Sequence, residues 1–412
     1  MPESSPVALR GWLSALLVTV AAFAAMLLVA SVGLWLAHAA DLPGGGFGAV
    51  VCATVLMAMG APLRLDGGAA FVASAQGGVT ALPLSVGLTG ALVAGALFLR
   101  PLRSHAVVTA RELGLRAAQT AVVWTVAVLL LSLAAGHTFT VSTGDPLLDE
   151  IGGAFDAEPV VGFKVDPGPA IGWGLLWLAV VLLIALAVSR RAPLPARLVR
   201  FHVGVRPAAH AVLTLALVYV VLGLVAGVVA LVVGSQPRET LAVVLLGLPN
   251  VAWLALGVGL GGSWHGHLPG SLGLPFPEAL SGVLRSRENV TLDLSTLAAQ
   301  DARAWLLLPL AGVLVLLAGA AVAWRTPVRL PAWRHAVHLA VAMALALLLI
   351  SVATRISAVY GLSLLGLVGS DGAADLTPDL WRTVPLAAAW GAAAGFAGGA
   401  LANRFRRPPT TD

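Results

Sequence analysis

The side chains in this sequence that could bind a solute or an ion gather in two short stretches rich in glycine. Both stretches adjoin apolar segments that are too short or too interrupted to be simple membrane spans. The candidate cavity-lining residues are Arg64, Asp66, Ser74 and Gln76 in the first stretch, and Asn250, His265 and His267 in the second. If these side chains act together, the chemistry they offer is the binding of a small polar solute.

The first stretch allows two interpretations. Arg64 and Asp66 are followed by Gly67 and Gly68, and glycine permits tight backbone turns. If a cavity opens here, Arg64 and Asp66 could form an ion pair at its mouth. If it does not, the segment is a turn at the membrane interface whose backbone groups satisfy one another. We favour the turn.

The second stretch could place two imidazoles near one metal ion, because His265 and His267 are separated by a single glycine. Two ligands are too few for a protein zinc site, so a further residue such as Glu278 or Asp293 would have to contribute. Histidines without a metal are the simpler interpretation, and we predict no cofactor. Signatures of phosphate-binding loops, zinc peptidases and serine hydrolases are missing. We therefore expect a protein that is not an enzyme.

The composition indicates that these stretches belong to a membrane protein and not to a water-soluble one. Of the 412 residues, 59% are hydrophobic and 10% are charged, whereas soluble domains carry about 25% charged residues. The net charge of +5 does not indicate nucleic-acid binding, because the basic residues form short clusters between apolar runs and lack interleaved aromatic residues. The single cysteine, Cys52, excludes an intramolecular disulfide.

Eight apolar runs are long enough to cross roughly 30 Å of hydrocarbon as helices. They lie near 13–37, 80–99, 117–135, 170–188, 209–234, 304–324, 336–353 and 383–402. The stretch 47–62 is shorter, and 241–262 is interrupted by Pro249. The sequence thus predicts an all-α polytopic membrane protein with about eight transmembrane helices, two re-entrant or half-helical segments, and the lipid bilayer as its main partner.

Basic residues predict the orientation, because Lys and Arg are retained on the cytoplasmic side of short loops. If the loops 100–116, 190–206 and 325–334, the segment 404–407 and the N-terminus with Arg10 are cytoplasmic, 16 of the 24 Lys and Arg residues lie inside. Both irregular segments then enter and leave by the outer face, and the C-terminus is cytoplasmic. A variant with an external N-terminus and a crossing 47–62 segment moves only Arg10 and stays open.

The order of spans and loops recurs, which predicts a first membrane repeat over 1–195, a second over 196–407 and a disordered tail at 408–412. In the last span, Gly391, Gly395 and Gly399 lie on one helical face. Such a face permits close helix packing within the bundle or, alternatively, in a homo-oligomer. The polar segment after the second stretch alternates like a strand over 290–294, and Ser295 is placed to cap a helix.

The expected spans contain no charged residue in their interiors, whereas ion-coupled transporters usually place ionisable groups at membrane depth. This absence favours a non-enzymatic accessory or envelope component. The alternative is a permease or exporter for a neutral or lipophilic small molecule, with its site between the two irregular segments.

The glycine-rich run over 65–95, the Arg-Pro-Leu-Arg sequence at 100–103 and the nearly lysine-free loops resemble the streptophobe family, hydrophobic multi-pass proteins of Streptomyces and related actinobacteria. The resemblance implies a bacterial cytoplasmic membrane protein and carries no assigned activity, ligand or functional residue.

Overall fold

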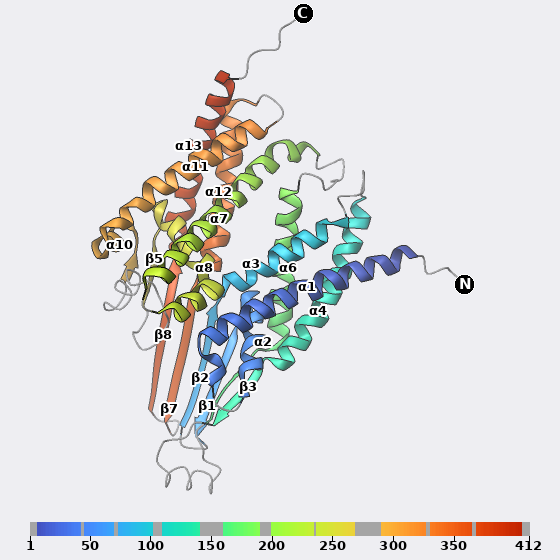
Figure 1. The fold of residues 1–412 in the computed structure, drawn as a ribbon, viewed down its shortest axis with the longest axis vertical. Coiled ribbons are helices and arrows are strands. Elements are labelled where there is room, and N and C mark those ends of the chain that lie inside the picture. The colour runs from blue at the N-terminus through green and yellow to red at the C-terminus, as the bar shows by residue number, and fades with distance from the viewer. Residues whose placement is uncertain are drawn as a thin grey trace, which may run out of the picture.

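The computed structural model describes residues 6–42, 45–69, 73–101, 109–140, 160–189, 199–234, 236–267, 290–326, 330–364 and 368–405. These residues form a bundle of helices with one antiparallel sheet at one end of it (Figure 1). The beginning of the first helix and the end of the last helix both lie away from the sheet.

Helices make up most of the bundle. Eight of those in the described ranges are long and apolar enough to cross a membrane: α1 (Pro6–Leu36), α4 (Ala110–Ala134), α6 (Pro167–Val188), α7 (Val199–Val233), α8 (Pro237–Gly259), α11 (Leu307–Arg325), α12 (Ala332–Ala353) and α13 (Leu380–Phe405). Shorter helices are α2 (Phe47–Ala58), α3 (Leu84–Leu99) and α10 (Leu294–Gln300), with two 3-10 turns, η1 (Ala39–Asp41) and η6 (Ala302–Leu306). The prediction of a helical, multi-pass membrane protein is confirmed.

Two predicted segments differ from the structure. The span expected from residue 80 begins only at Leu84, because Thr80 and Ala81 belong to a strand. The stretch expected to be broken at Pro249 is one continuous helix, α8. Proline removes one helical hydrogen bond, and near this point the hydroxyl of Ser85 on α3 contacts the backbone of α8, accepting from Leu248 N–H and donating to the Val244 carbonyl.

In the described ranges the sheet has eight strands, although the sequence indicated only one of them. The strands are β1 (Leu63–Ala69), β2 (Ala73–Ala81), β3 (Gly136–Thr140), β4 (Val160–Lys164), β5 (Trp264–His267), β6 (Val290–Leu292), β7 (Ile356–Leu364) and β8 (Val368–Pro378). Their order across the sheet is β3-β4-β1-β2-β7-β8-β5-β6. Strands from the first half of the chain thus fill one side, strands from the second half fill the other, and β2 and β7 join them.

The predicted strand over 290–294 is present as β6, but its helix cap is different. Asp293, not Ser295, caps α10: its carboxylate accepts from the backbone N–H of Thr296, and the Thr296 hydroxyl accepts from Asp293 N–H. Ser295 lies inside the helix and donates to the Asp293 carboxylate. The aspartate was overlooked because serine also suits an N-cap and stands only two residues further on.

Asp293→Ala should expose α10 to faster hydrogen exchange, because an N-cap contributes about 1 kcal/mol. Burial raises the pKa of Asp293, but hydrogen bonds from Ser295 and Thr296 outweigh it and lower the pKa overall. The cap should therefore hold across pH 5–8 and weaken only as the carboxylate protonates, below the ordinary aspartate value of about 3.9. Asp293→Asn, which keeps a capping oxygen, is the control. Equal exchange in the alanine variant and the wild type would contradict this assignment.

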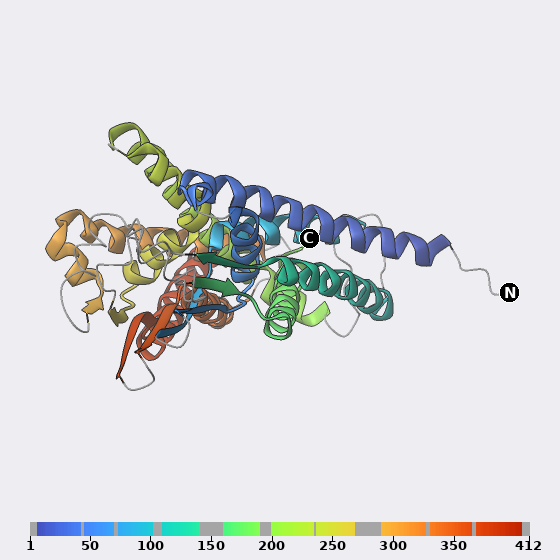
Figure 2. The ribbon, with the colours of Figure 1, turned by 90° about the horizontal axis from the view of Figure 1, so that it is seen from below.

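Viewed from the end that carries the sheet, the helices of the two halves occupy different sides of the molecule (Figure 2). One buried apolar core lies among α1, α2, α3, α4 and α6, and a second among α7, α8, α11, α12 and α13. A smaller cluster under the sheet contains Trp264, Leu292 and Leu376.

The glycine-rich face of α13 is covered within the chain. Gly391, Gly395 and Gly399 lie against the backbone of α12, and a Cβ on Gly395 would stand 2.5 Å from the carbonyl oxygen of His335. Gly398, on another face of α13, lies against Gly319 of α11. The face proposed for a homo-oligomer is therefore occupied by α12 and is not available to a second copy.

Candidate functional site

The candidate residues lie on the sheet and beside it, and they do not surround a common cavity. Arg64 and Asp66 are on β1, Ser74 and Gln76 on β2, and His265 and His267 on β5. Asn250 is apart from them, within α8. The prediction that the first stretch forms a turn was wrong, because both polar segments pair as strands.

The strand register separates a polar from an apolar face. Side chains alternate along a strand and directly paired residues share a face, so the pairings Asp66↔Gln76, Arg64↔Lys164 and His265↔Thr377 place these groups on one face. The opposite face carries the apolar side chains of Leu63, Phe163, Trp264 and Leu292, of which Trp264 and Leu292 are fully buried. The sheet thus turns its apolar face toward the cores and its charged side chains outward.

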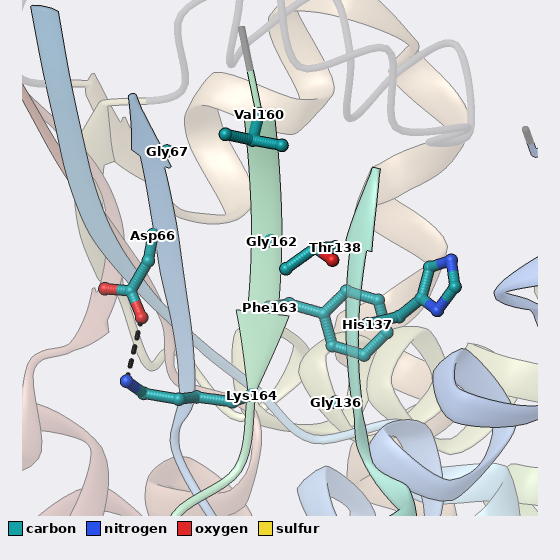
Figure 3. A pocket seen from close by; sticks show the side chains of 9 residues that line it. All are labelled: Asp66, Gly67, Gly136, His137, Thr138, Val160, Gly162, Phe163 and Lys164. Atoms are coloured by element: carbon teal, nitrogen blue, oxygen red, sulfur yellow. Dashed lines mark ion pairs between the residues drawn. The ribbon is translucent and has the colours of Figure 1, made fainter. Parts of the chain in front are cut away.

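Four charged side chains form two ion pairs on the polar face. Arg64 contacts Asp166 at 2.7 Å, and Lys164 contacts Asp66 at 3.0 Å (Figure 3). Arg64 and Lys164 stand opposite one another in the register, so each is balanced by a carboxylate rather than left beside a like charge. More than half of each basic side chain is exposed, and such exposed pairs contribute at most about 1 kcal/mol each.

The Arg64–Asp66 ion pair of the alternative cavity interpretation is replaced by these two pairs. Both actual partners come from the segment around β4, a hundred residues further along the chain. Pairing of β1 with β4 is therefore what decides the partners.

A shallow trough of about 650 Å³ lies beside the Asp66–Lys164 pair. On the polar face its floor is Gly162, which stands between Asp66 on β1 and Thr138 on β3. The missing side chain makes the depression, since a Cβ at Gly162 would lie 3.0 Å from the Thr138 methyl carbon. The trough holds one carboxylate, one amine, one hydroxyl and the imidazole of His137 at an open surface, a set that can bind polar groups.

His265 and His267 lie on a strand rather than in a loop. His265 Nδ1 is 3.1 Å from the Thr291 hydroxyl, and its Nε2 is 3.8 Å from an Asp379 carboxylate oxygen. His267 stands opposite Asp375 in the register. Among the residues that the structure describes, no group of three or more His, Cys, Asp or Glu side chains could hold a metal ion. Asp293 is used as a helix cap, and Glu278 lies outside the described residues.

Asn250 joins the two halves of the chain. Its side-chain oxygen accepts from the backbone N–H of Leu84 at 3.1 Å, and its side-chain nitrogen donates to the Leu82 carbonyl at 2.8 Å. Both partners lie where β2 passes into α3. The amide therefore closes a helix-to-turn contact and does not face an open cavity.

Three residues of the polar face were missed in the sequence: Lys164, Asp166 and Asp379. Asp166 precedes Pro167 and Asp379 precedes Leu380, at the start of α6 and α13. An aspartate directly before a long apolar run is a recognisable helix-start signal, and it could have placed both carboxylates at the edge of the membrane region. It could not have named their basic partners.

Comparison of the chain with protein-family models, with curated proteins and with solved structures finds no match.

Proposed function

We propose that this protein is a non-enzymatic component of a bacterial envelope whose membrane helices hold the polar face of the sheet outside the cytoplasmic membrane. The observation that carries the proposal is the single sheet to which both halves contribute four strands, with its charged face turned away from the helix cores. Resemblance to the streptophobe family agrees with a role in the membrane of an actinobacterium.

Because the strands belong to one sheet, they all lie on the same side of the bilayer. This restricts which helices can cross it. The chain from β2 to β3 leaves and rejoins the sheet through α3 and α4, so both cross or neither does. The chain from β4 to β5 contains three long helices, α6, α7 and α8, of which an even number can cross. We assign α8 as the one that does not cross, because Asn250 and Val244 in its middle bond to residues 82–85, directly after β2.

This assignment leaves eight crossings, α1, α3, α4, α6, α7, α11, α12 and α13, with α2 and α8 as the two segments that remain near the outer face. The 16 residues of α3 extend only about 24 Å as a helix, so the bilayer thins locally or α3 is supported by its neighbours. All basic loops then lie opposite the sheet. The positive-inside rule makes that side cytoplasmic, and the sheet faces the exterior.

In this arrangement the candidate residues do not form the binding site that a permease would need. It requires the polar residues of the two irregular segments to meet around a solute. Six of the seven instead lie on strands, and the seventh, Asn250, is bonded to the turn that precedes α3.

Cysteine labelling tests the arrangement. In a Cys52→Ala background, Gln76→Cys on the exposed polar face should react fully with a membrane-impermeant maleimide added to intact cells. Ala252→Cys, in the buried face of α8, should react only after denaturation. Arg404→Cys, at the end of α13, should react only after the membrane is permeabilised and serves as the control for sidedness.

Each label has an outcome that contradicts the proposal. Reaction of Ala252→Cys from outside would indicate a water-filled path along α8 and favour a permease. Protection of Gln76→Cys in intact cells, with reaction after permeabilisation, would place the sheet in the cytoplasm.

A further inference from the structure

The two blocks of strands are arranged alike. The first block has the order β3-β4-β1-β2 and the second β7-β8-β5-β6, so each begins with its third and fourth strands and ends with its first and second. In this correspondence β5 takes the place of β1, and β8 takes the place of β4.

The turns that lead into β1 and β5 share the same geometry. Gly60 and Gly261 have positive φ of 101° and 92°, the left-handed conformation that favours glycine after a helix. Each donates its N–H to the carbonyl three residues back, and the next residue donates to the carbonyl five residues back: Gly60 to Met57, Ala61 to Leu56, Gly261 to Val258 and Gly262 to Gly257. In both halves the strand begins three residues after this glycine, at Leu63 and at Trp264.

The second residue of each of these strands contacts an aspartate in the same relative place. Arg64 stands opposite Lys164 and contacts Asp166, two residues further on. His265 stands opposite Thr377 and approaches Asp379, again two residues further on. Both aspartates directly precede the last helix of their half, α6 or α13. The two contacts therefore tie equivalent strands to equivalent helices.

The basic partner differs in one respect, its response to pH. Arginine stays charged at every physiological pH, whereas histidine gains its charge between about pH 8 and pH 5. At 3.8 Å the His265 Nε2 is too far from Asp379 for a hydrogen bond, so attraction requires a charged ring. We propose that the His265–Asp379 contact is an acid-dependent link between the sheet and α13, and that Arg64–Asp166 is its permanent counterpart.

Other titratable groups near His265 come from β5 itself and from three neighbouring elements. On β8, Asp375 shares the polar face with Thr377, and at the start of α13 Arg382 donates its backbone N–H to Asp379. After β6, Asp293 carries hydrogen bonds that keep it ionised across the range in which histidine titrates. The strand neighbour at Nδ1 is Thr291, which does not titrate. On β5 itself, His267 lies two residues along the strand and stands opposite Asp375. Histidine is the one side-chain type among these described groups that ordinarily titrates between pH 5 and 8.

Hydrogen exchange followed by mass spectrometry, on the full chain in lipid nanodiscs at pH 5.5 and 7.5, tests the link. Exchange times are scaled for the intrinsic effect of pH, and segment 63–69 serves as the internal reference. Segments 264–267 and 290–300 should be about threefold better protected at the lower pH, as expected for one cross-strand charge pair. An unchanged ratio to segment 63–69 in the wild type would overturn the proposal without recourse to any variant.

Substitutions at residues 265 and 64 test whether the charge of the side chain, and not its packing, causes the pH dependence. His265→Arg should protect these segments equally at both pH values, and His265→Gln should leave them equally less protected at both. In a His265→Arg background, Arg64→His should move the pH dependence to segment 63–69, with segments 264–267 and 290–300 then serving as the reference. A pH response that persists in His265→Gln, or that fails to move with Arg64→His, would show that another group is responsible.

Discussion

Gly395→Leu should destabilise the protein by at least about 3 kcal/mol, the upper end of the cost of overpacking a core. The added Cβ would lie 2.5 Å from the His335 carbonyl oxygen and 2.9 Å from the Ala336 Cα, both backbone atoms of α12. A backbone cannot turn aside as a side chain can, so α12 and α13 would have to separate. In lipid, helices associate through such close packing.

The matched control is Gly172→Leu, in α6, where no atom lies within 4 Å of an added Cβ. It should leave stability unchanged or raise it slightly, because leucine favours a helix more than glycine does. Thermal unfolding in a mild detergent, followed by the fluorescence of the 12 tryptophans, compares the two. Equal melting of both variants would contradict the tight α12–α13 contact.

Asn250→Leu should cost about 2–6 kcal/mol, because it leaves two backbone groups without partners. The N–H of Leu84 and the carbonyl of Leu82 would each lose a hydrogen bond at a partly buried site, and each unpaired group costs about 1–3 kcal/mol. The apolar leucine side chain does not compensate, because it removes the amide partner of each hydrogen bond and leaves the backbone partner in place without one.

Thr214→Val is the comparison for this variant, because the Thr214 hydroxyl is exposed and bonds only to its own helix, at the His210 carbonyl. It should change stability by less than about 0.5 kcal/mol. Hydrogen exchange at residues 82–85 should rise in Asn250→Leu alone. If α8 were instead a loosely held gate, exchange there would be fast in the wild type and would not respond to the substitution.

The helical part of the fold was largely readable from the sequence. An apolar run long enough for the bilayer has to form a helix, because every backbone polar group must be satisfied within the segment. Predicted and observed ends agree within a few residues for α6, where 170–188 was expected and Pro167–Val188 is found. The longest discrepancy is at α7, which begins ten residues early at Val199 because its basic, interfacial turns are helical as well.

The sheet was not readable, because its strands are weak local signals. Segment 73–81 is made of Ala, Ser, Gln, Gly, Val and Thr, and glycine and alanine are depleted in ordinary strands. Its strand partner β7 is nearly 300 residues away in the chain. Only the folded bundle, which brings the ends of α3 and α12 next to the sheet close together, supplies the pairing that makes these residues a strand.

For the candidate site, the sequence alone determined three things: that the chain lies in a membrane, that the expected spans have no charge in their interiors, and which two stretches concentrate the polar side chains. Tertiary structure alone decided what those side chains contact: Arg64 with Asp166, Asp66 with Lys164, His265 with Asp379, and Asn250 with the backbone at Leu82 and Leu84. Hydropathy is a property of each segment and does not depend on the fold. An ion pair or hydrogen bond between residues about a hundred or more positions apart depends on the register of strands and the docking of helices.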